Sequence, residues 1–364
     1  MKKGVVLFLL LVISFIELIQ VHGQPQVPCY FIFGDSLADD GNNNLLPTLA
    51  KANYEPYGVD FPEGPTGRFC NGRTIVDILA EMMGFDDYIQ PFATANGTEI
   101  LKGVNYASGG AGILNETGQT SGARICMDEQ LNNHQVTVSS IVSMLGSSQS
   151  ATEYLNKCFY SVGMGDNDYI NNYFQPDYYT SSLLYTPEQF AKVLIEKFSQ
   201  QIETLYNYGA RKIALFGVGM LGCTPNAISV YGTNGSTCVE FMNYESSFFN
   251  VELKSLVDSL NTEKPDATFI YVDAVKLAED IMAAAFNVTT VGCCEVEELT
   301  GLCIPFETPC QNRSEYAFWD SFHPSEAANV ISAIGAYSVI FPSEFYTRDK
   351  SLVLSFNHGS VMAV

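Results

Sequence analysis

The chain alternates short runs rich in β-branched and aromatic residues with longer segments whose apolar residues recur every three to four positions. Strands separated by helices are typical of a parallel sheet that carries helices on both faces. No internal repeat, charge block or Pro/Gly-rich linker divides this pattern, so we expect residues 24–364 to form a single three-layer α/β/α domain with loop insertions. The predicted strands are Tyr30–Phe33, Gly103–Tyr106, Cys158–Val162, Lys212–Phe216 and Thr268–Val272.

The clearest predicted helix covers residues 186–208. Thr186 is a favourable N-cap, Pro187 suits the first helical position and Gly209 follows the last one. Between these ends, apolar residues from Phe190 to Leu205 mostly follow three- and four-residue steps, as an amphipathic helix requires.

The first residues differ from the rest of the chain. Lys2 and Lys3 precede a twelve-residue, largely apolar run, Val5–Ile16, which Glu17 closes. A run of this length is too short to span a bilayer and suits the hydrophobic region of a signal peptide. No later run reaches transmembrane length. We therefore expect residues 1–23 to be a cleaved signal peptide and the mature chain to be secreted; an N-terminal anchor helix is the alternative.

The charge balance excludes some classes of partner. The sequence has 18 Lys and Arg against 40 Asp and Glu, a formal net charge of −22. A chain this acidic is a poor match for nucleic-acid phosphates, and it would not be attracted to anionic lipid either. A lipid-like substrate would therefore have to be held by apolar contacts.

Two further patterns fit a secreted chain. Asn-x-Ser/Thr sequons occur five times, and we expect some of them to be glycosylated. The ten cysteines are expected to form disulfides in an oxidising compartment, although about 945 complete pairings are possible. The adjacent Cys293 and Cys294 should take separate partners; zinc is the alternative, although the chain has no CxxC pair. The sequon asparagines are Asn96, Asn115, Asn234, Asn287 and Asn312, and the remaining cysteines are Cys29, Cys70, Cys126, Cys158, Cys223, Cys238, Cys303 and Cys310.

Chemically useful residues follow several of the predicted strands, and in parallel α/β sheets the carboxyl ends of the strands carry the functional site. The first run leads into Ser36, the second into a glycine turn at residues 108–112, and the third into Asn167. Near the C-terminus, Asp320 precedes His323 by three residues. A hydroxyl, a glycine turn, an amide and an acid–imidazole pair are together the parts that acyl transfer requires.

Histidine is scarce enough to narrow the choice of base. A serine hydroxyl becomes a good nucleophile only when a base accepts its proton, and an acid must hold that base in the correct tautomer. Without the signal peptide, His134, His323 and His358 remain, and His323 is the one with an acid, Asp320, at a three-residue offset. The candidate catalytic residues are therefore Ser36 as nucleophile, His323 as base and Asp320 as its partner.

Three groups are candidates for an oxyanion hole. They are the backbone N–H of Ser36, the backbone N–H of Gly109 and the side-chain amide of Asn167. The glycine that flanks Ser36 lets the backbone approach a substrate closely. Gly110 is the alternative to Gly109, because either could present its N–H at that turn.

These positions carry a resemblance to the plant GDSL esterase/lipase family of SGNH hydrolases. Four blocks match in the expected order between Tyr30 and Phe341, which is most of the chain. The blocks are Phe33–Asn44 (FGDSLADDGNNN), Asn105–Gly112 (NYASGGAG), Gly165–Tyr169 (GDNDY) and Phe318–Pro324 (FWDSFHP).

The resemblance implies a flavodoxin-like three-layer α/β/α fold and a serine esterase mechanism. By match to the first and last blocks, Ser36 is the nucleophile, and His323 is the base that later protonates the leaving alcohol. Asp320 orients the imidazole. Ser36, Gly109 and Asn167 would hold the oxyanion, each donor worth about a hundred- to a thousandfold in turnover. We expect neither a cofactor nor a metal.

Other patterns are weaker. Residues 217–222 fit the GxGxxG pattern of dinucleotide-binding loops, but Pro225 comes where the following helix should begin its second turn. The GxSxG of α/β-hydrolases is absent from the sequence. Asp35, Asp39 and Asp40 are more typical of a solvated acidic loop than of a calcium site. An aromatic patch after the third block is either core or an acyl-chain groove; its members are Tyr169, Tyr173, Phe174, Tyr178 and Tyr179.

The expected function is hydrolysis of carboxylic esters by a secreted serine esterase or lipase, through an acyl-enzyme on Ser36. Two alternatives remain: transfer of the same acyl group to an acceptor alcohol, and a catalytically silent extracellular binding protein. The family acts on acyl lipids, cutin-type polyesters and acetylated polysaccharides, and the sequence leaves the substrate and the oligomeric state open. Glu295, where family members often have glycine, is a departure that concerns a cysteine-rich loop and not the catalytic set.

Overall fold

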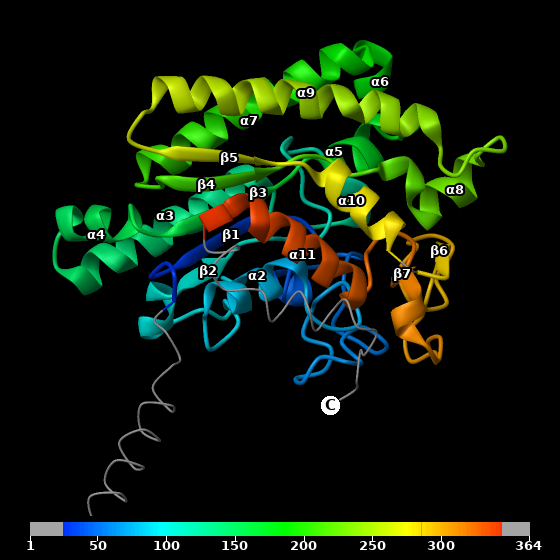
Figure 1. The fold of residues 1–364 in the computed structure, drawn as a ribbon, viewed down its shortest axis with the longest axis horizontal. Coiled ribbons are helices and arrows are strands. Elements are labelled where there is room, and N and C mark those ends of the chain that lie inside the picture. Colours follow the sequence, from blue (N-terminus) through cyan, green and yellow to red (C-terminus); the bar gives the residue numbers. More distant parts are fainter. Residues whose placement is uncertain (1–24, 285, 344–364) are drawn as a thin grey trace, which may run out of the picture.

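A computed structural model gives the fold of the chain and describes residues 25–284 and 286–343 (Figure 1). The predicted signal peptide, residues 1–23, lies outside the described residues, as does the segment from residue 344 onward. Within the described ranges, no helix is long and apolar enough to cross a membrane.

Five parallel strands form the central sheet. They are β1 (Tyr30–Gly34), β2 (Gly103–Asn105), β3 (Phe159–Gly163), β4 (Lys212–Phe216) and β5 (Thr268–Val272). Their spatial order is β2-β1-β3-β4-β5, the order of flavodoxin-like folds. All five predicted strands are confirmed, with ends within one residue of those expected. Tyr30 is in register with Phe159, Phe159 with Lys212, and Lys212 with Thr268, so the carboxyl ends of the strands share one edge.

Helices cover both faces of this sheet, which confirms the three-layer α/β/α architecture (Figure 1). One face carries α3 (Met127–Leu145), α4 (Ser148–Leu155), α7 (Pro187–Asn207) and α9 (Glu240–Glu263), and the other carries α2 (Ile75–Met83), α10 (Ala274–Ala283) and α11 (Glu326–Ile340). Short helices α5 (Asp166–Asp168), α6 (Ser181–Leu184) and α8 (Pro225–Tyr231) lie in the connections.

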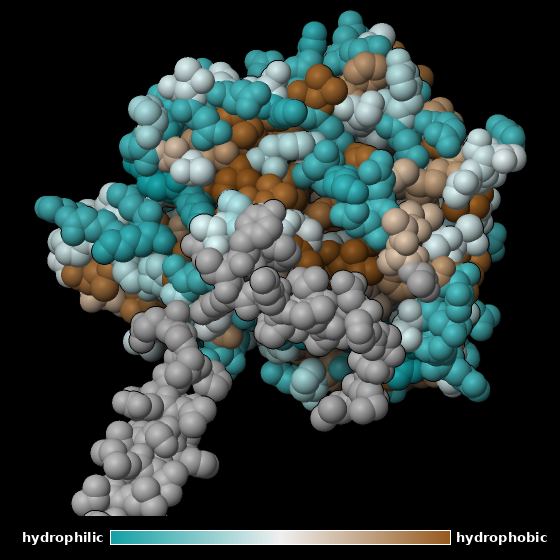
Figure 2. All heavy atoms as spheres, in the orientation of Figure 1, coloured by the Kyte–Doolittle hydropathy of each residue, from teal (hydrophilic) through white to brown (hydrophobic). Residues whose placement is uncertain are grey.

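The alternation of side chains along the strands builds two cores. On β1, Phe31 and Phe33 pack under α3, α7 and α9, whereas Tyr30 and Ile32 pack under α2 and α11. Hydrophilic side chains dominate the outer surface along α9, and hydrophobic ones gather on the visible face between α9 and α11 (Figure 2). Because both faces of β1 are covered, its run of residues is apolar throughout.

The predicted helix at residues 186–208 is α7, and its ends are where the sequence places them. The Thr186 hydroxyl accepts the N–H of Gln189, and the Gln189 side chain accepts the N–H of Thr186 in return. Pro187 lies in the first turn, and Gly209 follows the helix with a φ of +109°.

A second, two-stranded parallel sheet pairs β6 (Val288–Gly292) with β7 (Tyr316–Phe318) next to α8. The loop between these strands contains two disulfides, Cys293–Cys310 and Cys294–Cys303. The prediction that the adjacent cysteines take separate partners is therefore confirmed. A third small core, which includes Trp319, packs against this disulfide-bonded loop.

Eight of the ten cysteines are paired, so the expected pairing of all ten is wrong. Cys29–Cys158 joins the starts of β1 and β3, and Cys223–Cys238 closes the loop before α9. Cys70 and Cys126 are free and buried. Each of these two thiols donates to a nearby oxygen, at 2.9 and 3.2 Å respectively, and packs as a small apolar residue.

Candidate active site

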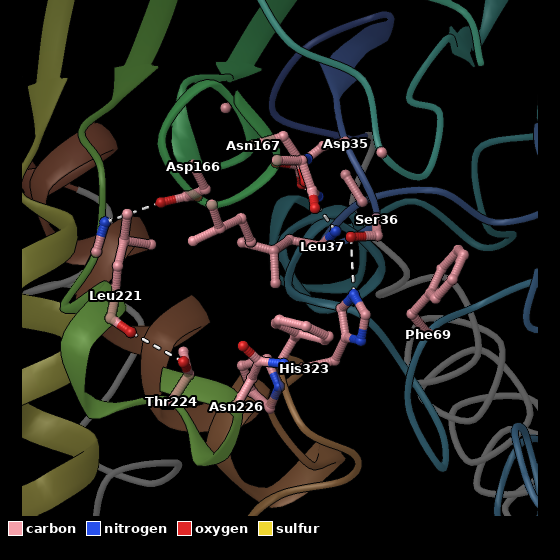
Figure 3. Close-up of a pocket in the computed structure, with 18 of the residues that line it drawn as sticks. Asp35, Ser36, Leu37, Phe69, Asp166, Asn167, Leu221, Thr224, Asn226 and His323 are labelled. Carbon is pink, nitrogen blue, oxygen red and sulfur yellow. Dashed lines mark hydrogen bonds between the residues drawn. The ribbon is translucent and has the colours of Figure 1, made fainter. Parts of the chain in front are cut away.

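Three of the candidate residues, Ser36, Asn167 and His323, meet at the carboxyl edge of the central sheet (Figure 3). Ser36 lies in the turn that follows β1, and Asn167 lies in α5, which follows β3. Asp320 and His323 come from the loop between β7 and α11, and His323 is 287 residues beyond Ser36. Residues from three distant parts of the chain therefore share one cavity wall.

A continuous hydrogen-bond chain joins the serine, the imidazole and the carboxylate. His323 Nε2 lies 2.7 Å from Ser36 Oγ (Figure 3). On the other side of the ring, His323 Nδ1 lies 2.7 Å from Asp320 Oδ2 and 2.9 Å from Oδ1. Asp320 is fully buried and His323 is 6% exposed, so bulk water competes little for either hydrogen bond. This is the arrangement in which an imidazole can accept a hydroxyl proton.

The carboxylate of Asp320 is held by more than the imidazole. Its Oδ1 accepts the N–H groups of Phe322 and His323, each at 2.8 Å. Its Oδ2 accepts the phenol of Tyr57 at 2.7 Å. Sequence reasoning did not single out Tyr57, because the tyrosine is 263 residues from Asp320 and belongs to none of the four blocks.

The side-chain amide of Asn167 points at two acceptors beside the serine. Its Nδ2 donates to Asp35 Oδ2 at 3.1 Å and to the carbonyl of Ala111 at 3.0 Å. Burial raises the pKa of Asp35 well above its usual range, and the charge of Asp166 raises it further. Burial also raises the pKa of Asp166 to about 6, although this side chain accepts the N–H of Gly219 in the cavity wall. Asp35 is therefore buried and hydrogen-bonded, and is not the solvated loop charge that the sequence favoured.

The two glycines that the sequence left as alternatives have different partners. The N–H of Gly109 donates to Asp39 Oδ2 at 2.9 Å, and its carbonyl accepts from Asn43 at 2.9 Å. A Cβ at Gly109 would lie 2.7 Å from the ring of Phe69, so only glycine fits there. Gly110 has a φ of +79° and lines the cavity. The predicted donor Gly109 is thus already occupied, and the geometry favours Gly110.

A cavity of about 590 Å³ opens beside Ser36 and His323. Its size is in the range of small-molecule sites, and its exposed lining is mainly apolar. Part of the apolar lining comes from α2 and α10 on one face of the sheet, and includes Ile75, Val76, Leu277, Ile281 and Met282. Such a lining suits a hydrocarbon portion of a ligand, held by contacts and not by charge.

The four sequence blocks and this geometry can be compared with known proteins. The family model described as GDSL-like lipase/acylhydrolase matches residues 30–334. The chain belongs to this family. The enzyme is similar to GDSL esterase/lipase At1g29670 of Arabidopsis thaliana, at 49% identity over 96% of this chain and 98% of the relative. It is 51% identical to GDSL esterase/lipase At1g29660 of the same species, over 91% and 93% of the two chains. The enzyme is therefore a carboxylic ester hydrolase with small-molecule ester substrates.

The aromatic patch of this GDSL enzyme was expected to be either core or an acyl-chain groove, and its members divide between the core and the cavity wall. Tyr169 and Tyr173 are buried in the main core, and Phe174 packs against it. Tyr178 is 73% exposed and lines the cavity. Core packing therefore accounts for most of the patch, and a single ring contributes to the cavity wall.

The GxGxxG segment of the enzyme has a packing explanation. A Cβ at Gly222 would lie 2.1 Å from the carbonyl oxygen of Val239, so this glycine allows two loops to touch. The Cys223–Cys238 disulfide closes the same loop. Pro225 begins the separate helix α8, which Thr224 caps.

Among the residues that the structure describes, no group of three or more His, Cys, Asp or Glu could hold a metal ion. The acids of the first block instead bind backbone groups and a cation. Asp39 accepts the N–H groups of Gly41 and Asn42 at 2.8 Å each, and Asp40 lies 3.9 Å from Arg68. Asp39 therefore fixes the backbone that follows the Ser36 turn, and Asp35 Oδ1 holds the turn itself by accepting the N–H of Leu37 at 3.0 Å.

Proposed function

We propose that this family member hydrolyses carboxylic esters through an acyl-enzyme on Ser36, with His323 as general base and Asp320 as its orienting partner. The observation that carries the proposal is the chain of hydrogen bonds from Ser36 Oγ through both ring nitrogens of His323 to Asp320, at 2.7 Å on each side. Such a chain is what nucleophilic catalysis by serine needs.

In the first half-reaction, Ser36 Oγ forms a bond to the carbonyl carbon of the ester while its proton passes to His323 Nε2. The electron pair of the carbonyl bond moves onto its oxygen. When this intermediate collapses, the bond to the alcohol breaks, and the leaving oxygen takes the proton from Nε2. Water then repeats the sequence at the acyl carbon and releases the acid, which regenerates Ser36.

The oxyanion of that intermediate would be held by the N–H groups of Ser36 and Gly110 and by Nδ2 of Asn167. Nδ2 of Asn167 donates to Asp35 and Ala111 in the structure, so one of these bonds must be exchanged for the oxyanion. Exchange at Asp35 is the simpler of the two, because Asp35 Oδ2 belongs to a side chain that can move, whereas the carbonyl of Ala111 is fixed in the backbone. Asp35 thus keeps the amide in place between turnovers.

The cavity supports an ester with an apolar acyl chain. The cavity that contains Ser36 is lined by Ile75 and Val76 of α2 and by Leu277 and Ile281 of α10. The net charge of −22 disfavours anionic substrates, which agrees with a neutral hydrocarbon. We therefore expect longer acyl esters to be better substrates than acetate.

A secreted setting is part of the proposal. Residues 1–23 have the pattern of a signal peptide, and four disulfides support an oxidising compartment. The five sequon asparagines are all exposed, as glycosylation requires: Asn96, Asn115, Asn234, Asn287 and Asn312. N-terminal sequencing of the secreted protein and a mobility shift after glycosidase treatment test both points.

The proposal is tested with a p-nitrophenyl ester series, from acetate to palmitate, and the secreted wild type and Ser36→Ala. We expect turnover in the wild type that is lost in Ser36→Ala, and labelling of the wild type alone by a fluorophosphonate. Full activity in Ser36→Ala contradicts the proposed nucleophile. A folded wild type that neither hydrolyses an ester nor takes the label would instead be a binding protein. Adding an acceptor alcohol distinguishes a hydrolase from an acyltransferase, since acyl transfer gives a new ester in place of the free acid.

The acyl pocket has a matched pair of tests on α10. Ile281→Trp places a large ring in the cavity and should move the preferred chain to a shorter length. Glu279→Trp adds the same ring on the exposed side of the helix and should leave the preference unchanged. If all three proteins prefer the same acyl-chain length, the acyl chain does not bind beside Ile281.

A further inference from the structure

Tyr57 is a fully buried tyrosine in the connection between β1 and α2. Its phenol oxygen lies 2.7 Å from Asp320 Oδ2 and 3.1 Å from the backbone nitrogen of Cys303. The Cys303 N–H can only donate, so it occupies an acceptor position of the phenol oxygen. The carboxylate of Asp320 is then the acceptor for the phenol proton. The direction of both hydrogen bonds is thereby fixed.

The ring of Tyr57 also supports the imidazole. It packs edge-on against Phe69, with centroids 6.0 Å apart and an interplanar angle of 67°. Phe69 in turn lies 4.9 Å from the ring of His323. One side chain therefore touches the carboxylate directly and backs the imidazole through a neighbour, from a segment outside all four family blocks.

The hydrogen bond has a chemical consequence for the base. Asp320 Oδ1 is held by two backbone N–H groups, whereas Oδ2, at 2.7 Å the nearer oxygen to His323 Nδ1, has Tyr57 as its other donor. Burial and the charge of Asp320 raise the pKa of Tyr57 well above its usual range, so the phenol remains a donor throughout the working range of pH. Its proton fixes Oδ2 and withdraws part of the negative charge that would otherwise stabilise the imidazolium.

We propose that Tyr57 is a positioning residue for the esterase reaction, which holds Asp320 Oδ2 against His323 Nδ1 and tunes the acidity of the imidazolium through that carboxylate. The inference rests on the proposed triad. Tyr57 does not touch the substrate and is not itself a catalytic residue.

Tyr57→Phe tests this role, with Tyr54→Phe as its matched control. Tyr54 is on the same segment, packs edge-on against Tyr57 and donates its phenol to the carbonyl of the same residue, Cys303, at 3.0 Å. Each variant loses one phenol hydrogen bond to the disulfide-bonded loop and keeps its ring. Only Tyr57→Phe also removes the donor to Asp320.

In Tyr57→Phe we expect kcat to fall about ten- to a hundredfold, because Asp320 loses a hydrogen bond of the strength typical for charged groups and no longer holds the imidazole firmly. KM should stay within about twofold of the wild type, because Tyr57 does not touch the substrate. The acid limb of the kcat/KM profile should move to higher pH, since a carboxylate with one donor fewer stabilises the imidazolium more. Tyr54→Phe should keep kcat, KM and the profile of the wild type. Unfolding midpoints, measured in parallel, should fall in both variants, and further in Tyr57→Phe, because the fully buried Tyr57 phenol makes two hydrogen bonds and the half-buried Tyr54 phenol makes one.

Each other outcome overturns the inference. If Tyr57→Phe keeps wild-type kcat and profile, or if both variants change kcat and the profile equally, Tyr57 has only a structural role in the loop. Measuring Ser36→Ala in the same experiment shows whether the role of Tyr57 or the triad itself is wrong. If Ser36→Ala is inactive and Tyr57→Phe behaves like the wild type, only the role of Tyr57 is refuted. A fully active Ser36→Ala refutes both proposals.

Discussion

The two halves of the candidate triad are held in place by different means. Ser36 follows β1, which lies inside the five-stranded sheet with β2 and β3 as hydrogen-bonded neighbours, and all residues of β1 are buried. Asp320 and His323 follow β7, whose partner β6 has no fully buried residue. The nucleophile is thus placed by regular backbone pairing, and the acid–base pair is not.

In the second half, cross-links and side-chain contacts reinforce a short and irregular backbone pairing. The N–H groups of Cys293 and Cys294 donate to the carbonyls of Phe318 and Trp319, at 3.1 and 2.9 Å. Both cysteines are also disulfide-bonded within the loop, and the phenol of Tyr57 bridges that loop to Asp320. The comparison indicates that a short sheet can place catalytic groups when covalent bonds limit its motion. The acid–base half should then be the more sensitive to loss of a cross-link.

The largest expected effect tests whether the halves act as one unit. Ser36→Ala and His323→Ala should each lower kcat by about 10⁴- to 10⁶-fold, and the double variant should lose little more. Neither half is useful alone, since the hydroxyl needs the base and the base has no other nucleophile to activate. If the two losses in kcat multiplied in the double variant, Ser36 and His323 would not share one proton transfer. Single-turnover measurements on purified, folded protein distinguish a multiplied loss from one that is little larger than in the single variants.

Within the sheet-anchored half, Asn167→Ala should lower kcat by roughly 10²- to 10³-fold, because it removes one proposed oxyanion donor. Asn171→Ala is a graded control: Asn171 Nδ2 donates to Asn167 Oδ1 and orients the amide without supplying the proposed donor. It should therefore have the smaller effect. A greater loss in Asn171→Ala than in Asn167→Ala would exclude Asn167 as the donor.

Two disulfides sharpen the comparison directly. Replacing Cys294 and Cys303 by serine should lower kcat about ten- to a hundredfold, because small displacements of a catalytic group are costly. Replacing Cys29 and Cys158 should leave kcat per folded molecule unchanged but cost more stability. The closed loops span 9 and 129 residues, which corresponds to about 3 and about 5 kcal/mol in the chain-entropy model. Thermal unfolding measures the loss of stability, and active-site titration gives kcat per folded molecule. The comparison would be contradicted if loss of Cys29–Cys158 lowered kcat and loss of Cys294–Cys303 did not.

Sequence predicted those features that local pattern determines. The strands and α7 follow from periodicity and capping, so their ends agree with the structure to about a residue. The candidate triad residues follow from residue chemistry and motif order. Partners that only the tertiary fold brings together were not predictable: Asp39 reaches Gly109 across 70 residues, and Tyr57 reaches Asp320 across 263. The unpaired Cys70 and Cys126 belong to the same class, since pairing depends on distances that sequence does not contain.

The two halves also differ in how their acids respond to pH. In the sheet-anchored half, burial raises the pKa of Asp166 and Asp168 to about 6. Beside the disulfide-bonded loop, hydrogen bonds from Arg313 and Asn71 lower the pKa of Asp60 against the opposing effect of burial. A carboxyl whose pKa is raised by folding binds more protons in the folded state than in the unfolded state, and one whose pKa is lowered binds fewer.

The smallest predicted effect follows from that sign. Each raised carboxyl takes up a proton in the folded state at pH values between its unfolded pKa, near 3.8, and its folded pKa, about 6. The free energy of unfolding should therefore rise as pH falls, by on the order of 1 kcal/mol for each group between pH 7 and pH 5. The lowered acid, Asp60, opposes this only as pH falls toward 3.8 and below. The buried His134, whose pKa burial lowers to about 3, opposes it within the window, because its unfolded form takes up a proton there and its folded form does not. Asp39, whose pKa burial also raises to about 6, adds a third acid that favours stability at lower pH. Denaturant unfolding should therefore show greater stability at pH 5 than at pH 7. Asp168→Asn should reduce the slope and Asp60→Asn should not, since of these two acids only Asp168 titrates in this window. An equal slope in Asp168→Asn and the wild type would mean that Asp168 is charged in the folded enzyme over this range of pH.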